Sequence, residues 1–206
     1  MATFYISDTH LGHERILELG SGRPFASIGE HNAIIRNNWF ETVTPEDTVF
    51  VMGDIAMGRE FEKNLQLFFD LPGIKKFIPG NHDRIFSGNN SSERIERFLP
   101  LYEAVGFEVL PENTKTSVLT SYGVQEVLLS HFPYSGDSHS EVDRYAANRY
   151  KNEGLPIVHG HTHSREILNP HNVLEFHVGV DAHNFTPVNE VVIIDWLENL
   201  KNEGHL

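Results

Sequence analysis

The sequence predicts an α/β layered domain, and two observations carry this prediction. Short apolar runs alternate along the chain with helical patterns, which is typical of sheets covered by helices. Polar residues that can bind metals or transfer protons follow directly after several of these runs. The predicted strands, in chain order, are Thr3–Ser7, Thr48–Met52, Lys76–Pro79, Glu126–Ser130, Ile157–His159, Leu174–Val178 and Val191–Asp195.

Three segments carry helical patterns: Glu30–Phe40, Glu60–Phe69 and Ser92–Ala104. In the second segment the apolar side chains recur at helical spacing, and Pro72 prevents the helix from continuing. A β-hairpin is expected between about Phe107 and Leu129. The chain of 206 residues suits a single domain over residues 1–206.

Composition excludes several classes of protein. No stretch approaches the roughly 18 apolar residues of a membrane span, and the start of the chain has no basic segment typical of a secretory signal. With 0 cysteines, disulfides and thiolate zinc sites are excluded. We therefore expect a soluble, cytoplasmic protein without a membrane partner.

The charge balance argues against nucleic acid as a partner. The chain has 16 Lys and Arg against 29 Asp and Glu, which gives a formal net charge of −13. Proteins that bind the phosphate backbone normally present a basic surface. A small-molecule partner is therefore expected, and the sequence leaves the oligomeric state open.

Five predicted strands end in polar clusters. Ligands of α/β sheets bind in the crevice outside the carboxyl ends of the strands, so these clusters should converge in one crevice. The clusters are Asp8-Thr9-His10, Gly53-Asp54, Gly80-Asn81-His82-Asp83, His131 and Gly160-His161-Thr162-His163.

These residue types suit divalent transition metals. Asp8 and His10 are two residues apart, so on a strand they would share a face and chelate one ion. His161 and His163 repeat this spacing. Mixed nitrogen and oxygen ligands without sulfur favour Mn, Fe, Zn, Co or Ni over Mg or Ca. A bridging carboxylate, an amide oxygen and a further imidazole are available from Asp54, Asn81 and His131.

The order of these motifs, from Asp8 to His163, resembles the calcineurin-like metallophosphoesterase superfamily. The compact length is similar to that of the small bacterial or phage members. The resemblance implies a four-layer α/β/β/α sandwich of two mixed sheets flanked by helices. It also implies metals at the joined carboxyl edges of the two sheets.

The resemblance implies two divalent metal ions, with Mn²⁺ expected first and Fe, Zn, Ni or Co as alternatives. The first ion would be held by Asp8, His10 and His163, the second by Asn81, His131 and His161, and Asp54 would bridge them. A hydroxide shared by the ions would attack phosphorus directly. His82 would act as the general acid, and Asp83 would orient its ring.

Other residues have weaker assignments. His13, Arg15 and Arg84 are expected to bind substrate phosphate. The segment Pro133–Arg149, with Tyr134, His139, Arg144 and Arg149, forms either one wall of the cleft or a solvated loop. His159 is expected to face the core, and His177, Asp181 and His183 to be structural. Surface positions are expected for His31, His171 and His205.

The main functional prediction is hydrolysis of phosphate esters, with diesters favoured over monoesters. Two alternatives stay open. The first is a nuclease, and the second is a non-catalytic scaffold that keeps the fold. A scaffold should have lost ligands or the acid histidine, whereas His82 and all the proposed ligands are present.

Overall fold

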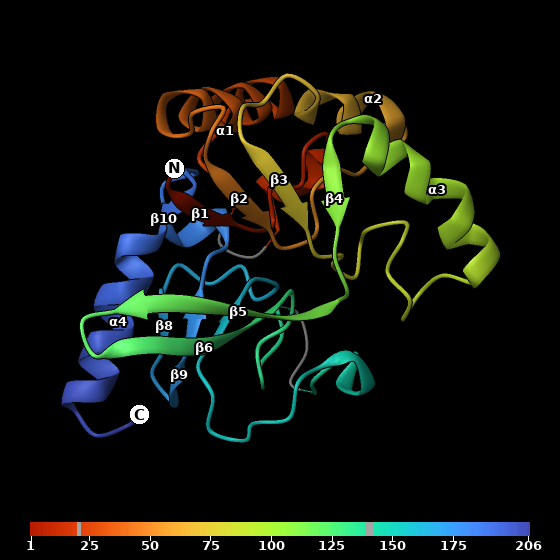
Figure 1. Cartoon of the computed structure of the whole chain (residues 1–206). Helices are drawn as coiled ribbons and strands as arrows, with labels where there is room; N and C mark the ends of the chain where they lie inside the picture. Colours follow the sequence, from red (N-terminus) through yellow and green to blue (C-terminus); the bar gives the residue numbers. More distant parts are fainter. Residues whose placement is uncertain (20–21, 139–141) are drawn as a thin grey trace.

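The computed structural model describes residues 1–19, 22–138 and 142–206, which form two mixed β-sheets and four α-helices (Figure 1). The first sheet has the order β10-β1-β2-β3-β4 and the second the order β5-β6-β7-β9-β8. The strands are β1 Thr3–Ile6, β2 Thr48–Val51, β3 Ile74–Phe77, β4 Phe107–Val109, β5 Asn113–Thr120, β6 Gly123–Ser130, β7 Ile157–His159, β8 Leu168–Asn169, β9 Asn172–His177 and β10 Val188–Asn189. The helices are α1 Ile28–Thr42, α2 Phe61–Leu65, α3 Ser92–Ala104 and α4 Glu190–Asn202, with 3₁₀ turns at Glu14–Leu17, Gln66–Phe68, Ala146–Asn148 and Val180–Ala182.

Both sheets place the carboxyl ends of parallel strands at one edge. In the first sheet β1, β2, β3 and β4 run parallel and only β10 is antiparallel. In the second sheet β6, β7 and β9 run parallel, while β5 and β8 are antiparallel. The predicted α/β fold with two mixed sheets and helices is confirmed.

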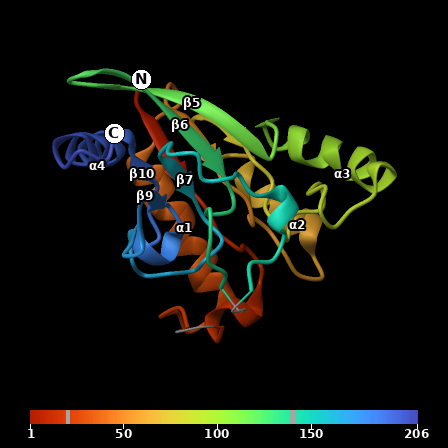
Figure 2. The same cartoon turned by 90° about the horizontal axis from the view of Figure 1, so that it is seen from below.

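Two hydrophobic cores hold the layers together. The first lies between the first sheet and helices α1, α2 and α3, and it contains the fully buried Trp39, Phe68 and Tyr102 (Figure 1). The second lies between the two sheets and includes Met52 and Leu129. Helix α4 contributes to this second core, and Figure 2 shows it on the opposite side of the molecule from α3.

The strand predicted at Val191–Asp195 is wrong, because these residues belong to α4. The Asn189 side chain accepts a hydrogen bond from the Val191 backbone N–H and caps the helix at its first turn. Ile193, Trp196, Leu197 and Leu200 are buried and recur at helical spacing. Burial of this face outweighs the β preference of the Val and Ile run.

The hairpin prediction is right only in its second part. Strands β5 and β6 form the hairpin, with Thr120 paired to Gly123 at its tip. Residues Phe107–Val109 instead pair parallel with β3 and complete the first sheet. The long α3 between β3 and β4 makes this parallel crossover possible.

The two sheets meet at the ends of β1 and β9. The Ser7 backbone N–H donates to the Val178 carbonyl at 3.1 Å, and the Val180 N–H donates to the Ser7 carbonyl at 3.1 Å. This contact brings the carboxyl ends of both sheets to one place. Among the residues described, none of the helices has the length and apolar character needed to cross a membrane.

Candidate metal centre

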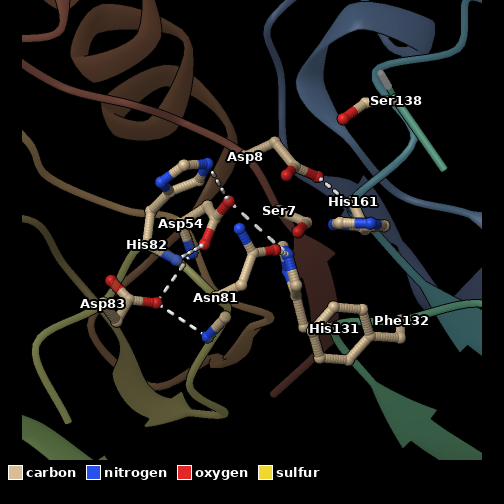
Figure 3. A network of polar contacts seen from close by, with 12 residues as sticks. Ser7, Asp8, Asp54, Asn81, His82, Asp83, His131, Phe132, Ser138 and His161 are labelled. Atoms are coloured by element: carbon tan, nitrogen blue, oxygen red, sulfur yellow. Dashed lines mark hydrogen bonds and ion pairs between the residues drawn. The ribbon is translucent and has the colours of Figure 1, made fainter. Parts of the chain in front are cut away.

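The strand ends bring all seven predicted metal ligands together. The loops after β1, β2 and β3 supply ligands from the first sheet, and those after β6 and β7 supply ligands from the second (Figure 3). The residues are Asp8, His10, Asp54, Asn81, His131, His161 and His163. Six of them are buried, and His163 is half-buried.

Five of these residues have a left-handed backbone, with φ of 60° at Asp8, 46° at His10, 54° at Asp54, 70° at His161 and 52° at His163. This conformation is uncommon for residues other than glycine, and it clusters at functional sites. The expected strand geometry of the Asp8 and His10 pair is wrong, since β1 ends at Ile6. The two side chains converge because the backbone bends sharply after the strand.

Two glycines allow the loops to approach closely. A Cβ on Gly160 would collide with the Ser7 side chain and lie 2.5 Å from Asp8 Oδ2. A Cβ on Gly53, whose φ is 89°, would lie 2.5 Å from the Gly80 backbone N. These positions therefore need glycine both for space and, at Gly53, for conformation.

The first group of ligand atoms joins Asp8, His10 and His163. Asp8 Oδ1 lies 4.0 Å from His10 Nε2 and 3.8 Å from His163 Nε2. Asp8 Oδ1 and His10 Nε2 are buried and have no hydrogen-bond partner in the described part of the chain. Buried polar atoms almost always have a partner, so this unpartnered pair fits a bound cation. The residues present therefore fit the metal that the motif implies.

The second group joins Asp54, Asn81 and His131. His131 Nε2 lies 3.5 Å from Asp54 Oδ2 and 3.1 Å from Asn81 Oδ1. The other ring nitrogen, Nδ1, lies 2.8 Å from the Met52 carbonyl oxygen and donates a hydrogen bond to it. This bond fixes the tautomer and leaves the Nε2 lone pair available to a metal. Figure 3 shows the His131 ring beside Asn81 and Asp54.

His161 is held by an aspartate that the sequence analysis did not identify. Its Nε2 lies 3.0 Å from Oδ2 of the fully buried Asp137 carboxylate. Asp137 is also paired with Arg144 at 2.6 Å and Arg149 at 3.6 Å. Burial and the charge of His131 lower the pKa of His161 to about 3, so the ring is neutral near pH 7 and able to bind a metal through Nδ1.

Asp181 orients His163 in the same manner. Its Oδ2 lies 3.1 Å from His163 Nδ1 and 2.7 Å from Arg23 Nη2. Arg23 also donates to the Asp8 carbonyl at 2.8 Å and contacts His31 Nε2 at 2.9 Å. Burial lowers the pKa of His163, but the hydrogen bond to Asp181 and the Asp8 charge overcome it and raise the pKa.

These contacts correct two expectations from the sequence. Asp181, expected to be only structural, directly contacts a proposed ligand. His31, expected at the surface, is fully buried beside Arg23. His159 and His177 are buried as expected for structural residues, and His171 is exposed.

His82 faces the centre from the solvent side. Its side chain is 41% exposed, and Nε2 lies 3.9 Å from Asp54 Oδ2. Its backbone N–H donates to Asp54 Oδ1 at 2.8 Å (Figure 3). The ring is thus tied to the middle of the site and still reaches solvent.

The predicted contact between Asp83 and the His82 ring is wrong. The Asp83 carboxylate is buried and accepts hydrogen bonds from the backbone N–H groups of Gly80 at 2.8 Å, Asp54 at 2.7 Å and Ile55 at 3.3 Å. It therefore links the loops after β2 and β3. Burial and the neighbouring Asp54 charge raise the pKa of Asp83 to about 7.

A cleft of about 250 Å³ opens over the ligands. His13 and Arg15 line it, as their predicted role in substrate binding requires, and Ser138 and Arg144 bring the 133–149 segment to its wall. Arg84 lies elsewhere, in an adjoining cleft. His139 lies outside the described residues.

The two mixed sheets thus bring buried imidazole, carboxylate and amide side chains, which are the types that bind divalent metals, together at their carboxyl ends. The sequence profile of the calcineurin-like phosphoesterases matches residues 1–165, and the chain belongs to this family. It is therefore a metal-dependent phosphoesterase, as the order of motifs predicted.

Relatives of similar length include phage proteins. The chain is 36% identical to the Gene 66 protein of Mycobacterium phage L5 over 187 residues, which cover 87% of this chain and 86% of that protein. It is 37% identical to the Gene 66 protein of Mycobacterium phage D29 over 193 residues, with 91% and 92% covered. A protein of unknown function from Aquifex aeolicus shares the fold, with a TM-score of 0.65, 24% identity and coverage of 93% of this chain and 97% of that one.

Proposed function

We propose that this phosphoesterase uses two metal ions to hydrolyse small phosphodiesters, with His82 as general acid. The position of Asp54 carries the proposal. Its Oδ2 lies 3.5 Å from His131 Nε2, 3.7 Å from His10 Nε2 and 3.9 Å from His82 Nε2. One carboxylate oxygen thus touches both ligand groups and the acid.

The proposed ligand sets are those that the family resemblance implies, and the close approach of Asp8, His10 and His163 supports the first of them. Asp8, His10 and His163 would hold one ion, Asn81, His131 and His161 the other, and Asp54 both. Two such ions, with Mn²⁺ expected first, would supply positive charge at the phosphoryl oxygens and would lower the pKa of an attacking water. Imidazole nitrogens together with carboxylate oxygens suit Mn, Fe, Zn, Ni or Co better than Mg or Ca.

The side chains of the chain account for the remaining steps. His13 and Arg15 line the cleft and would bind the phosphoryl oxygens of the substrate. A bond forms between water oxygen and phosphorus while the bond from phosphorus to the leaving oxygen breaks. His82 gives its proton to that leaving oxygen, which departs as an alcohol. The exposed edge of the His82 ring allows the proton to be replaced from solvent.

The charges of the cleft favour diesters. The two arginines in its lining are Arg15 and Arg144. Arg144 is already neutralised by Asp137 at 2.6 Å, which leaves Arg15 as the free cation of the described lining. Beyond the charge of the two proposed ions, one free guanidinium suits a diester, which carries one negative charge, better than a dianionic monoester. The net charge of −13 favours a small substrate over nucleic acid.

The test is an assay of metal-stripped protein with Mn²⁺, Zn²⁺, Ni²⁺ or Mg²⁺ added back. Bis(p-nitrophenyl) phosphate and p-nitrophenyl phosphate are compared at equal concentration. We expect metal-dependent turnover that prefers the diester and disappears in Asp54→Ala. In His82→Ala, kcat for an ester with a poor leaving group should fall by roughly 10²–10⁴ while two ions still bind.

Three results would contradict parts of the proposal. A preference for the monoester would reject the substrate class. Binding of a single ion per chain, measured by calorimetry, would reject the two-metal site. Unchanged kcat in His82→Ala on the poor leaving group would reject its role as acid.

A further inference from the structure

A second cleft adjoins the metal centre on the side of His82. Its volume is about 300 Å³, and it shares Met57, Asn81 and His82 with the cleft over the ligands. His82 therefore stands between the two clefts. From Asn81 and His82 the second cleft continues to Arg84 and Arg94, and Asp8, His10 and Asp54 do not line it.

Two arginines give this cleft an unusual charge for an acidic protein. The Arg84 guanidinium lies 4.1 Å from the Phe61 ring centroid and 4.7 Å from that of Phe98. The Arg94 guanidinium lies 5.1 Å from the Phe98 centroid. In the described part of the chain neither arginine forms an ion pair with a carboxylate. Aromatic rings hold both guanidinium groups, which leaves their terminal N–H donors available.

The wall beside these arginines is built by fixed hydrogen bonds. Asn90 Oδ1 accepts from Arg94 Nε at 2.7 Å, and its Nδ2 donates to the Phe86 carbonyl at 2.8 Å. Asn89 Nδ2 donates to the Asn81 carbonyl at 2.8 Å and so links this wall to the metal centre. The positions of the arginines are therefore set before any ligand binds.

Burial and the charge of Arg94 lower the pKa of Arg84 from its usual value. The guanidinium stays charged, since arginine is effectively always protonated in proteins. Two cations that disfavour one another are stabilised by an anion placed between them. The cleft thus has the charge, the donors and the rigidity of an anion-binding site.

The position of His82 indicates which part of the substrate enters this cleft. In an in-line displacement the attacking and leaving oxygens lie on opposite sides of phosphorus. The general acid stands beside the leaving oxygen, so the leaving group extends past His82. The space past His82 is the second cleft.

We propose that the second cleft is a leaving-group subsite in which Arg84 and Arg94 bind a further phosphate carried by the departing alcohol. The substrate class is then a phosphoester whose alcohol portion carries a second phosphate. Planar guanidinium groups match the oxygen geometry of phosphate. This inference rests on the proposed function, because His82 defines the leaving side only if it acts as the acid.

The turnover test uses two methyl aryl phosphodiesters that differ at one group. The leaving phenol carries a 4-phosphonomethyl group in one diester and a 4-methyl group in the other, and the released phenol is measured by chromatography. With Mn²⁺ present we expect kcat/KM to be higher for the phosphonate by roughly 10- to 100-fold, the range given by charge-assisted hydrogen bonds. Arg84→Gln and Arg94→Gln should each reduce this ratio.

Arg97→Gln is the matched control. Arg97 is exposed on α3 and lies 5.3 Å from the Phe98 centroid, but it does not line the cleft. This variant loses the same charge and a contact with the same ring, so the substrate ratio should stay at the wild-type value. Arg84→Lys keeps the charge without the planar fork and should retain part of the preference even if Arg84→Gln unfolds.

A binding experiment separates this inference from the proposed function. Metal-free protein is titrated with 4-(phosphonomethyl)phenol, with p-cresol as the neutral comparison, by calorimetry. Binding of the phosphonate alone, weakened in Arg84→Gln and Arg94→Gln and kept in Arg97→Gln, supports the subsite even if no ester is hydrolysed. Metal-dependent turnover with equal kcat/KM for both diesters overturns the subsite and leaves the phosphoesterase intact. Phosphonate binding that is equal in all the variants also overturns it.

Discussion

The Asp8→Asn substitution should stabilise the metal-free protein while removing stabilisation by metal. Asp8 Oδ1 is fully buried and has no hydrogen-bond partner among the described residues. A buried unsatisfied polar group costs about 1–3 kcal/mol, and more if it is charged. An asparagine keeps an oxygen for the His161 backbone N–H, now 2.9 Å from Asp8 Oδ2, and its amide can donate to His10 or His163. Asparagine also tolerates the φ of 60° at this position.

The assay is thermal unfolding with a chelator and with excess Mn²⁺. About 1–3 kcal/mol corresponds to roughly 2–10 °C in a domain of this size, so the variant should melt that much higher without metal. With Mn²⁺ at about 100 times its Kd the wild type should gain about 2.7 kcal/mol, whereas Asp8→Asn should gain little. Glu41→Gln removes one exposed charge and should leave both transitions unchanged.

The stability gained in Asp8→Asn should depend on pH, in the direction set by the pKa of Asp8. Burial raises the pKa of Asp8, so the folded metal-free protein binds this proton more tightly than the unfolded chain does. The buried, ionised Asp8 carboxylate therefore lowers the free energy of unfolding at pH values above the pKa of Asp8 in the folded protein. This loss is absent at pH values below the usual pKa range of aspartate. The advantage of Asp8→Asn should shrink as the pH falls towards about 4. A lower melting temperature for the variant in chelator at pH 7 would refute the reasoning.

Three further variants test other contacts of the fold. Burial lowers the pKa of His31 to about 4, so the free energy of unfolding should fall by up to about 3 kcal/mol as the pH drops from about 6.5 to about 4. Urea unfolding of His31→Gln should show a smaller loss over this range, and an equal loss would exclude His31 as the cause. Asp181→Asn removes the charge that orients His163 and should weaken Mn²⁺ binding by roughly 10–100-fold in calorimetry. An unchanged affinity would show that the orientation of His163 does not depend on that charge. Gly160→Ala inserts a Cβ against Ser7 and should lower the melting temperature by roughly 2–10 °C, an effect that an unchanged transition would contradict.

The sequence predicted where the candidate ligands lie, because the polar clusters that contain them follow apolar strands. Asp8, Asp54 and His131 are found this way, since the end of a parallel strand in the sequence is also a place in the sheet. The same rule could have identified Asp181, which comes soon after the apolar end of β9. Its place in the sequence therefore indicates a contact with the candidate ligands.

Other parts of the site depend on the course of the loops, which the spacing of residues along the sequence does not predict. Asp137 contacts His161 from a loop in which it is also paired with Arg144 and Arg149. Arg23 contacts the Asp8 carbonyl from a loop without any motif. The strand predicted within α4 is wrong for another reason, because burial of residues such as Trp196 on one helical face outweighs the local β preference of the Val and Ile run.

The left-handed backbone lowers the thermal stability of this protein at positions that its proposed activity requires. These positions are Asp8, His10, Asp54, His161 and His163. Each such residue costs about 1 kcal/mol or more relative to glycine in the same conformation. If selection for activity ends, substitutions that replace these candidate ligands should therefore increase the stability of the encoded protein. Screens of random variants for heat resistance alone should enrich glycine or asparagine at these five sites, and the most heat-resistant variants should be the inactive ones.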